Sequence, residues 1–293
     1  MTPIQPRLII VALTSICTMA LVPVLVTVVD ANELTIGLAR VAIACAVLTP
    51  ILFFKRAFSG LSRRDWLALL LIGIVFAVHW WTYFYAIRHS SASLGALSLA
   101  TYGIHMLWIN WLLKSQKPKL SDALPILLCF SGCIIVAPSL DLSNHATQGF
   151  VVGVLSGFIY ALLPFMHQRI AHVPTAVRSW GQFSFAGLFF LLFWPQTNWQ
   201  LDSNDWWGLL VLGIVSTLIA HTLWVKATTE LPAVLSGAFY YLYIPIAMAL
   251  SYFFLNEEMT FSKLLGASLI VGSCLLGILL PVMRRGKKGI IQQ

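Results

Sequence analysis

Long apolar stretches alternate with short polar connections along the whole chain. A helix needs roughly 20 apolar residues to cross about 30 Å of hydrocarbon. Ten such stretches fit, at 7–29, 34–54, 66–87, 92–113, 121–139, 149–169, 176–196, 206–226, 232–255 and 262–282. No alternating pattern indicates strands, and backbone groups in lipid must be paired within each segment. The pattern therefore predicts an all-α integral membrane protein with ten transmembrane helices.

Composition supports this class of protein. Of the 293 residues, 59% are hydrophobic and only 10% are charged, whereas a soluble domain carries roughly 25% charged residues. The net charge of +8 fits a membrane topology signal better than nucleic-acid binding. The five cysteines lie inside apolar stretches without metal-ligand spacing, so we expect no disulfide, no metal site and no cofactor.

Basic residues in the connections predict the orientation, because Lys and Arg near span ends stay on the cytoplasmic side. With the N-terminus inside, the outer connections receive only Arg88 and Lys263. The inner side receives Arg7, Lys55, Arg56, Arg63, Arg64, Lys114, Lys117, Lys119, Arg169, Arg178, Lys226, Arg284, Arg285, Lys287 and Lys288. We expect both termini to be cytoplasmic.

The sequence also repeats itself. Asp65-Trp66, Leu69-Leu70 and Gly73-Ile74-Val75 recur 140 residues later as Asp205-Trp206, Leu209-Leu210 and Gly213-Ile214-Val215. After one inserted residue the offset becomes 141, and it matches Ala86, Ala92, Leu94, Tyr102, Ser121 and Cys133 with Ala227, Ala233, Leu235, Tyr243, Ser262 and Cys274. A constant register over about 70 residues indicates a duplication.

The duplication predicts two five-helix repeats, 1–143 and 144–293, the second followed by a short basic tail. Five is odd, so the second repeat crosses the membrane in the opposite direction to the first. Inverted repeats of this kind are the usual construction of secondary transporters. We expect the two halves to rock or gate against each other and to expose one central site alternately to each side.

Several motifs resemble those of the drug/metabolite transporter superfamily, and within it the EamA-type ten-helix carriers. They are Leu231-Pro232-Ala233, Tyr243-Ile244-Pro245, Asn256-Glu257-Glu258, Gly266-Ala267-Ser268-Leu269-Ile270 and the first-half module Ser91-Ala92-Ser93-Leu94. Gly149 and Arg40 fit the same pattern. The resemblance implies a carrier in a bacterial inner membrane, often an exporter or exchanger of amino acids or related small metabolites. A lipid or drug transporter of the same fold is the alternative.

Few ionisable residues lie well inside the predicted transmembrane segments. Apart from terminal positions the ten stretches contain no Asp or Glu, so a carboxylate site for a coupling ion is not expected. His79, His105 and His221 remain, and each either binds substrate or a proton or is hydrogen-bonded to a neighbouring helix. Arg40 either clamps a substrate carboxylate or phosphate or extends outward to Asp30 or Glu33.

Aromatic residues gather at mid-span. Trp80, Tyr102, Tyr240 and Tyr243 offer ring faces with a polar handle, which suits a cavity for amphipathic solutes, although packing alone explains any one of them. Pro23, Pro164 and Pro245 interrupt spans one, six and nine and are candidate hinges.

A face of small residues runs along span six. Small residues recur every four positions there, at Gly149, Gly153, Gly157 and Ala161. This spacing favours close packing against other helices of a monomer, and the alternative is that the face forms a homodimer contact. A membrane enzyme is the rival class, but the sequence has no GxxxxGK[ST], HExxH or G-x-S-x-G motif. The sequence thus predicts a carrier without catalytic residues.

Overall fold

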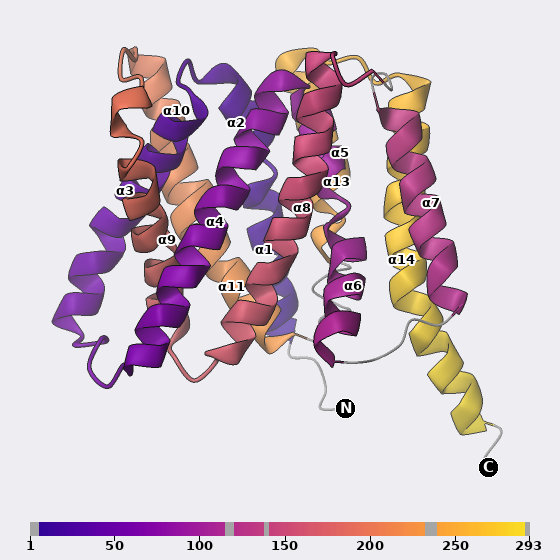
Figure 1. Cartoon of the computed structure of the whole chain (residues 1–293), viewed down its shortest axis with the longest axis horizontal. Helices are drawn as coiled ribbons and strands as arrows, with labels where there is room; N and C mark the ends of the chain where they lie inside the picture. Colours follow the sequence, from indigo (N-terminus) through magenta and orange to yellow (C-terminus); the bar gives the residue numbers. More distant parts are fainter. Residues whose placement is uncertain (1–5, 115–119, 138–140, 232–238, 291–293) are drawn as a thin grey trace.

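The computed structural model describes residues 6–114, 120–137, 141–231 and 239–290, which form helices and no strands (Figure 1). The α-helices are α1 (Pro6–Met19), α2 (Val22–Val28), α3 (Glu33–Phe54), α4 (Arg63–His89), α5 (Ala92–Leu99), α6 (Tyr102–Lys114), α7 (Leu120–Val136), α8 (His145–Arg169), α9 (Thr175–Leu191), α10 (Ser203–Gly213), α11 (Ala220–Glu230), α13 (Tyr243–Leu255) and α14 (Phe261–Ile290). Two short elements are the 3₁₀-helix η1 (Trp194–Gln196) and the π-helix η2 (Ile214–Ile219). The all-helical class predicted from the sequence is confirmed.

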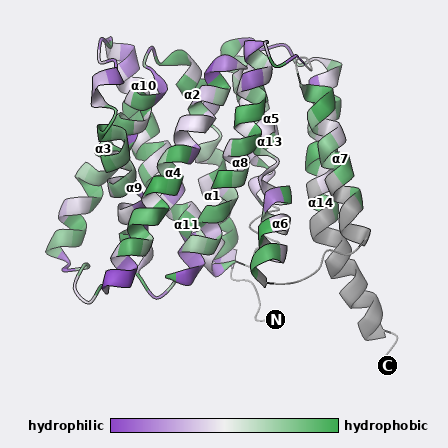
Figure 2. Ribbon diagram, in the orientation of Figure 1, coloured by the Kyte–Doolittle hydropathy of each residue, from purple (hydrophilic) through white to green (hydrophobic). Residues whose placement is uncertain are grey.

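Six helical segments in the described residues are long and apolar enough to cross a membrane. They are Pro6–Val28, Glu33–Phe54, Arg63–His89, Ala92–Leu113, His145–Arg169 and Ser203–Glu230, and shorter apolar helices include Tyr243–Leu255. Figure 2 shows hydrophobic residues along the middle of the bundle and hydrophilic ones gathered toward its two ends. This apolar band between polar ends is what a lipid bilayer requires.

Each of the ten predicted segments contains described helix, and turns interrupt some of them. The segment 7–29 is divided into α1 and α2 by a turn at Ala20–Leu21, and 92–113 is divided into α5 and α6 by a turn at Ala100–Thr101. Residues 232–238 and 138–139, which belong to two predicted segments, lie outside the described residues. Helix α14 continues to Ile290, so most of the predicted basic tail is helical.

The helix interruptions recur at the repeat spacing. A turn at Tyr241–Leu242 precedes α13, 141 residues after the turn that separates α5 from α6. Tyr102 opens α6 and Tyr243 opens α13, and these two tyrosines are also 141 residues apart. Discontinuous helices in a membrane expose backbone groups that are tolerated only where they are buried in protein or line a cavity.

The inserted residue of the second half has a structural counterpart. The repeat offset changes from 140 to 141 between Val215 and Ala227, and η2 (Ile214–Ile219) overlaps the start of that interval. A π-turn accommodates one extra residue within an otherwise regular helix. η2 and the start of α11 are held to α1 by two hydrogen bonds, from Ser216 Oγ to the Thr18 carbonyl at 2.8 Å and from Ser15 Oγ to the Ala220 carbonyl at 2.7 Å.

Helices pack in matching pairs. α4 packs against α8 and α9, just as the α10–η2–α11 segment packs against α1 and α3. α5 and α6 pack against α8, while α13 packs against α1 and α2. α3 contacts α9, α5 contacts α13, and α7 contacts α14. Exchanging each helix with its counterpart in the other half leaves this set of contacts unchanged.

The small-residue face of α8 packs inside the bundle. A side chain at Gly149 would meet backbone atoms of His89 and Ser90, and one at Gly153 would meet Ser98. All of these partners lie on α4, on α5 or in the connection between them. The face therefore serves the contact of α8 with α4 and α5.

Carboxylates fix helix starts at corresponding positions of the two halves. Asp65 and Asp205 each complete a capping box at the third position of α4 and α10. Each also contacts a connection of the other half, because Asp65 Oδ1 lies 2.9 Å from His172 Nε2 and Asp205 Oδ1 accepts a hydrogen bond from Asp30 N at 2.8 Å. These contacts tie the two halves together at both ends of the bundle.

Glu257, in the connection between α13 and α14, binds the start of α5. Its carboxylate accepts hydrogen bonds from Ser93 N and Ser91 Oγ and lies 3.3 Å from Lys263 Nζ. Burial raises the pKa of Glu257, but the hydrogen bonds from Ser93 and the charge of Lys263 outweigh burial, so that the pKa lies below its ordinary value of 4.5.

This contact predicts a pH-dependent stability. A carboxyl with a lowered folded-state pKa stabilises the protein above its unfolded-state pKa, and that stability is lost as the pH falls through the folded-state value. We expect Glu257→Gln to lower the melting temperature at pH 7 and to flatten its decline below about pH 4.5. The exposed neighbour Glu258 is the control, and a Glu258→Gln variant that behaves like Glu257→Gln contradicts this role.

Candidate binding site

Arg40 lies at the centre of the bundle. It stands on α3, and its side chain has no solvent exposure (0%). Its Nε donates to Thr217 Oγ1 at 2.9 Å and its Nη2 donates to the Ser216 carbonyl at 3.2 Å, so both partners belong to the π-turn of the other half. Its guanidinium carbon lies 3.9 Å from the ring centre of Trp80, a cation–π contact. Arg40 makes no ion pair to Asp30 or Glu33 within the described residues, unlike the alternative weighed from the sequence.

The positive charge of Arg40 is uncompensated. Its Nη1 is buried without a hydrogen-bond partner, and no carboxylate pairs with it among the described residues. Arg178 is also buried, but its guanidinium donates to the carbonyls of Val173 and His167 and to the hydroxyls of Thr229 and Thr175. A buried cation without an anion costs several kcal/mol. Of these two arginines, only Arg40 has a guanidinium nitrogen, Nη1, that is left without a hydrogen-bond partner.

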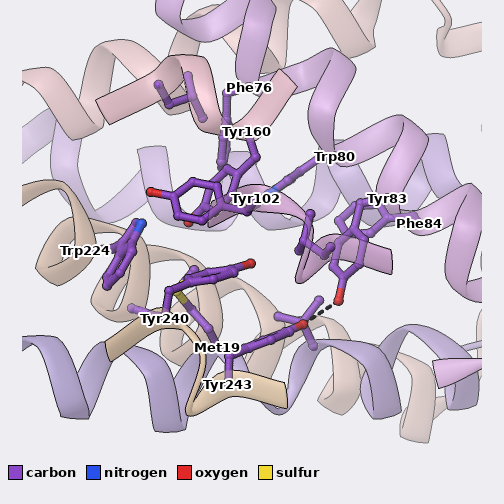
Figure 3. Close-up of a cluster of buried hydrophobic side chains, with 14 of the residues drawn as sticks. Met19, Phe76, Trp80, Tyr83, Phe84, Tyr102, Tyr160, Trp224, Tyr240 and Tyr243 are labelled. Carbon is purple, nitrogen blue, oxygen red and sulfur yellow. Dashed lines mark hydrogen bonds between the residues drawn. The ribbon is translucent and has the colours of Figure 1, made fainter. Parts of the chain in front are cut away.

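Aromatic side chains from both halves surround this guanidinium. Tyr83 and Tyr243 share a hydrogen bond between their hydroxyls, which joins α4 to α13. The ring of Tyr240 lies 5.5 Å from that of Tyr243 and 4.6 Å from that of Tyr102. Figure 3 shows these rings grouped around one central space, with the Tyr83–Tyr243 hydrogen bond dashed. The predicted residues Trp80, Tyr102, Tyr240 and Tyr243 thus lie in one cluster.

Two of the three predicted histidines belong to this cluster. His79 Nδ1 lies 2.8 Å from Ser156 Oγ, and the His79 ring stacks 4.4 Å from that of Tyr160. The ring of His221 lies 5.4 Å from that of Trp80. His105 is elsewhere, edge-on to Phe158 at 5.6 Å, and it lines neither of the two cavities described below.

A small cavity, here named the Arg40 cavity, opens within the cluster. It is lined by Met19, Val22, Arg40, His79, Trp80, Tyr83, Leu99, Tyr160, His221, Tyr240 and Tyr243. Its chemistry combines one unpaired cation with ring faces and phenol hydroxyls. The chemistry of these side chains is suited to an anionic group on the guanidinium and an apolar or cationic body against the rings. The cavity has room only for water-sized groups.

Sequence comparison identifies the family. The model of the EamA-like transporter family matches the chain twice, over residues 6–137 and 147–279. The chain belongs to the EamA-like transporter family. A curated relative from Bacillus subtilis (strain 168), named "Uncharacterized transporter YetK", is 25% identical over 265 residues, which are 84% of this chain and 77% of the relative. The chain is a membrane transporter.

A solved structure shares the fold of this EamA-like transporter. It is titled only "Crystal structure of protein", and it matches with a TM-score of 0.67 at 16% identity over 94% of this chain and 98% of that one. At this identity the likeness concerns the fold alone.

The prolines of this EamA-like transporter stand at different kinds of position. Pro23 is the second residue of α2, which follows the turn at 20–21, and Pro245 lies in the first turn of α13, where a missing N–H costs no helical hydrogen bond. Pro164 lies inside the continuous helix α8. Pro23 and Pro164 are 141 residues apart.

Some residues around Arg40 in this EamA-like transporter were not predicted from the sequence. Tyr83 lies three residues after Trp80 and one turn after His79, so helical spacing alone places it on the same face. Tyr160 is one turn before Pro164, at the level of the other aromatic residues. Thr217, which does not line the cavity but accepts a hydrogen bond from Arg40, carries no such signal, because its position depends on the π-turn.

Proposed function

We propose that the chain is an alternating-access secondary carrier, which exports or exchanges small carboxylate-bearing metabolites such as amino acids. The observation that carries this proposal is the buried Arg40, whose charge has no anionic partner among the described residues. Ionisable residues at membrane depth are costly and mark substrate pathways. A substrate carboxylate supplies the missing anion with two parallel hydrogen bonds.

The inverted repeat supports alternating access. The recurring helix interruptions, the matched helix pairs and the two separate family matches agree with the halves 1–143 and 144–293. The start of α1 and the end of α14 lie at the same edge of the bundle (Figure 1). Together with the basic inner connections, this favours cytoplasmic termini in a bacterial inner membrane.

The Arg40 cavity is built by both halves. Arg40, Trp80 and Tyr83 come from the first, and His221 and Tyr243 come from the second. A rotation of one half against the other therefore changes access to the guanidinium from each side. A monomer is sufficient for this mechanism, because the small-residue face of α8 is occupied inside the bundle.

Counterflow into proteoliposomes tests the proposal. Vesicles loaded with a defined mixture of amino acids, nucleosides and small metabolites are assayed by mass spectrometry against empty liposomes and a Trp80→Ala plus Tyr243→Ala variant. We expect uptake of carboxylate-bearing solutes by the wild type and its loss in the variant. Uptake of only neutral or cationic solutes contradicts the proposal, and movement of lipid instead favours a lipid transporter of the same fold.

A further inference from the structure

A second cavity adjoins the Arg40 cavity. The Trp224 cavity, as it is named here, is lined by Tyr160, Leu163, Pro164, His167, Gln182, His221, Trp224, Val225 and Thr228. Tyr160 and His221 line both cavities and therefore stand at their junction. Nothing in the function proposed above uses the remaining residues of this second cavity.

The two cavities are related by a spacing of 141 residues, which also relates the hydrogen bond from Ser15 Oγ to the Ala220 carbonyl to the one from Ser156 Oγ to the His79 carbonyl. Adding 141 to four residues that line the Arg40 cavity gives four residues that line the Trp224 cavity. Met19, Val22, Trp80 and Tyr83 become Tyr160, Leu163, His221 and Trp224 in this way. The same structural element thus forms a cavity in each half, and the two cavities meet at the centre of the bundle.

The side chains of the Trp224 cavity differ in charge from those of its counterpart. The Arg40 cavity contains a guanidinium, whereas Gln182 contributes an uncharged amide to the Trp224 cavity. None of the residues that line this cavity is an acid, a lysine or an arginine. The cavity therefore offers no charge to a second ionic group.

Three polar atoms around the Trp224 cavity are buried and unpartnered: Trp224 Nε1, Tyr160 OH and His167 Nδ1. The indole nitrogen is a donor and the phenol hydroxyl is both a donor and an acceptor. His167 Nε2 lies 2.7 Å from the amide oxygen of Gln182, which only accepts, so Nδ1 of the neutral ring is left as an acceptor. Each such atom is costly to bury unless a ligand pairs with it.

We propose that the Trp224 cavity is a second subsite, which binds an uncharged hydrogen-bonding group of the solute whose carboxylate is bound by Arg40. The inference rests on the carrier function proposed above and names its substrate class. That class is a carboxylate with a neutral donor–acceptor group, such as a carboxamide, an imidazole or a hydroxyl, at its other end. An apolar group of the same size leaves the three polar atoms unpaired and binds less tightly.

Equilibrium binding to the purified full-length chain in nanodiscs tests the subsite. L-Glutamine and L-methionine share their charged groups and the length of their side chains, but only glutamine carries a carboxamide. We expect the wild type to prefer glutamine by about tenfold or more. Trp224→Phe keeps an aromatic ring and removes the donor, so it lowers glutamine affinity and leaves methionine affinity within twofold. Trp207→Phe, at an exposed position, is the matched control and binds like the wild type.

Tyr160→Phe is the second variant, because it removes only an unpartnered hydroxyl and carries the test if Trp224→Phe does not fold. Equal Arg40-dependent binding of the two amino acids by the wild type overturns the subsite and leaves the carrier function standing. An equal loss for both amino acids in Trp224→Phe also overturns it, because that result indicates a structural role. Absence of any Arg40-dependent binding of carboxylates overturns both proposals.

Discussion

Replacing Arg40 with methionine is expected to abolish carboxylate transport. The substitution keeps a long unbranched side chain and removes the cation that the central cavity offers to an anion. Leaving one partner of a buried ion pair without the other costs about 3–5 kcal/mol, which corresponds to a loss of affinity of more than about 100-fold. The measurement is counterflow at several substrate concentrations, which separates a raised KM from a lowered maximal rate.

The same substitution has a second expected result, on stability. Without substrate, Arg40 is a buried charge with no counter-ion among the described residues, so Arg40→Met leaves the melting temperature unchanged or raises it. Arg178→Met is the matched control, because it deprives two carbonyls and two threonine hydroxyls of their donor and lowers the melting temperature. Full transport by Arg40→Met, or a large loss of its stability, contradicts the role given to this residue.

Replacing Gly149 with leucine is expected to have the largest effect on folding. A Cβ at this position lies 3.0 Å from the carbonyl carbon of His89 and from the nitrogen of Ser90, and 3.1 Å from the Ala86 carbonyl oxygen. Backbone atoms at the end of α4 yield less readily than a side chain. Overpacking of this kind costs about 1–3 kcal/mol or more, although leucine has the higher helix propensity.

Gly272→Leu is the control for the same exchange. A Cβ there meets no atom within 4 Å, so the gain in helix propensity predicts an unchanged or raised melting temperature. Thermal unfolding of both variants in detergent makes the comparison. Equal melting temperatures for the two variants contradict the close packing of α8 on α4.

Much of the fold was predictable because membrane helices must satisfy their own backbone. Apolar length alone located the described helices, and the register from Asp65–Asp205 to Cys133–Cys274 indicated two related halves. The interruption at 100–101 could not be predicted, since Ala100 and Thr101 are not helix breakers. Its counterpart at 241–242 is close to Pro245, but only the structure relates the two turns.

The site was predictable in its residue types and less so in its geometry. Aromatic residues at mid-span predicted a cluster, and seven of the eight candidate residues lie in it. The exception is His105. A single histidine in an apolar helix does not indicate which neighbouring helix its side chain will face. The hydrogen-bond partners of Arg40 could not be predicted either. The change of offset from 140 to 141 indicates an inserted residue, but it does not show that a π-turn places Ser216 and Thr217 beside the guanidinium.

Access to the Arg40 cavity from both membrane faces is the most direct test of this account. Met19 lines that cavity and is replaced by cysteine. The background is a variant in which the native cysteines have been replaced, at Cys17, Cys45, Cys129, Cys133 and Cys274. Sealed vesicles that hold the protein in one or the other orientation are then treated with a membrane-impermeant thiol reagent. Alternating access predicts labelling from either face, slowed in both cases by a transported carboxylate and not by its uncharged amide. Labelling from one face only, or at a rate that the carboxylate does not change, contradicts a central site that opens alternately to the two sides.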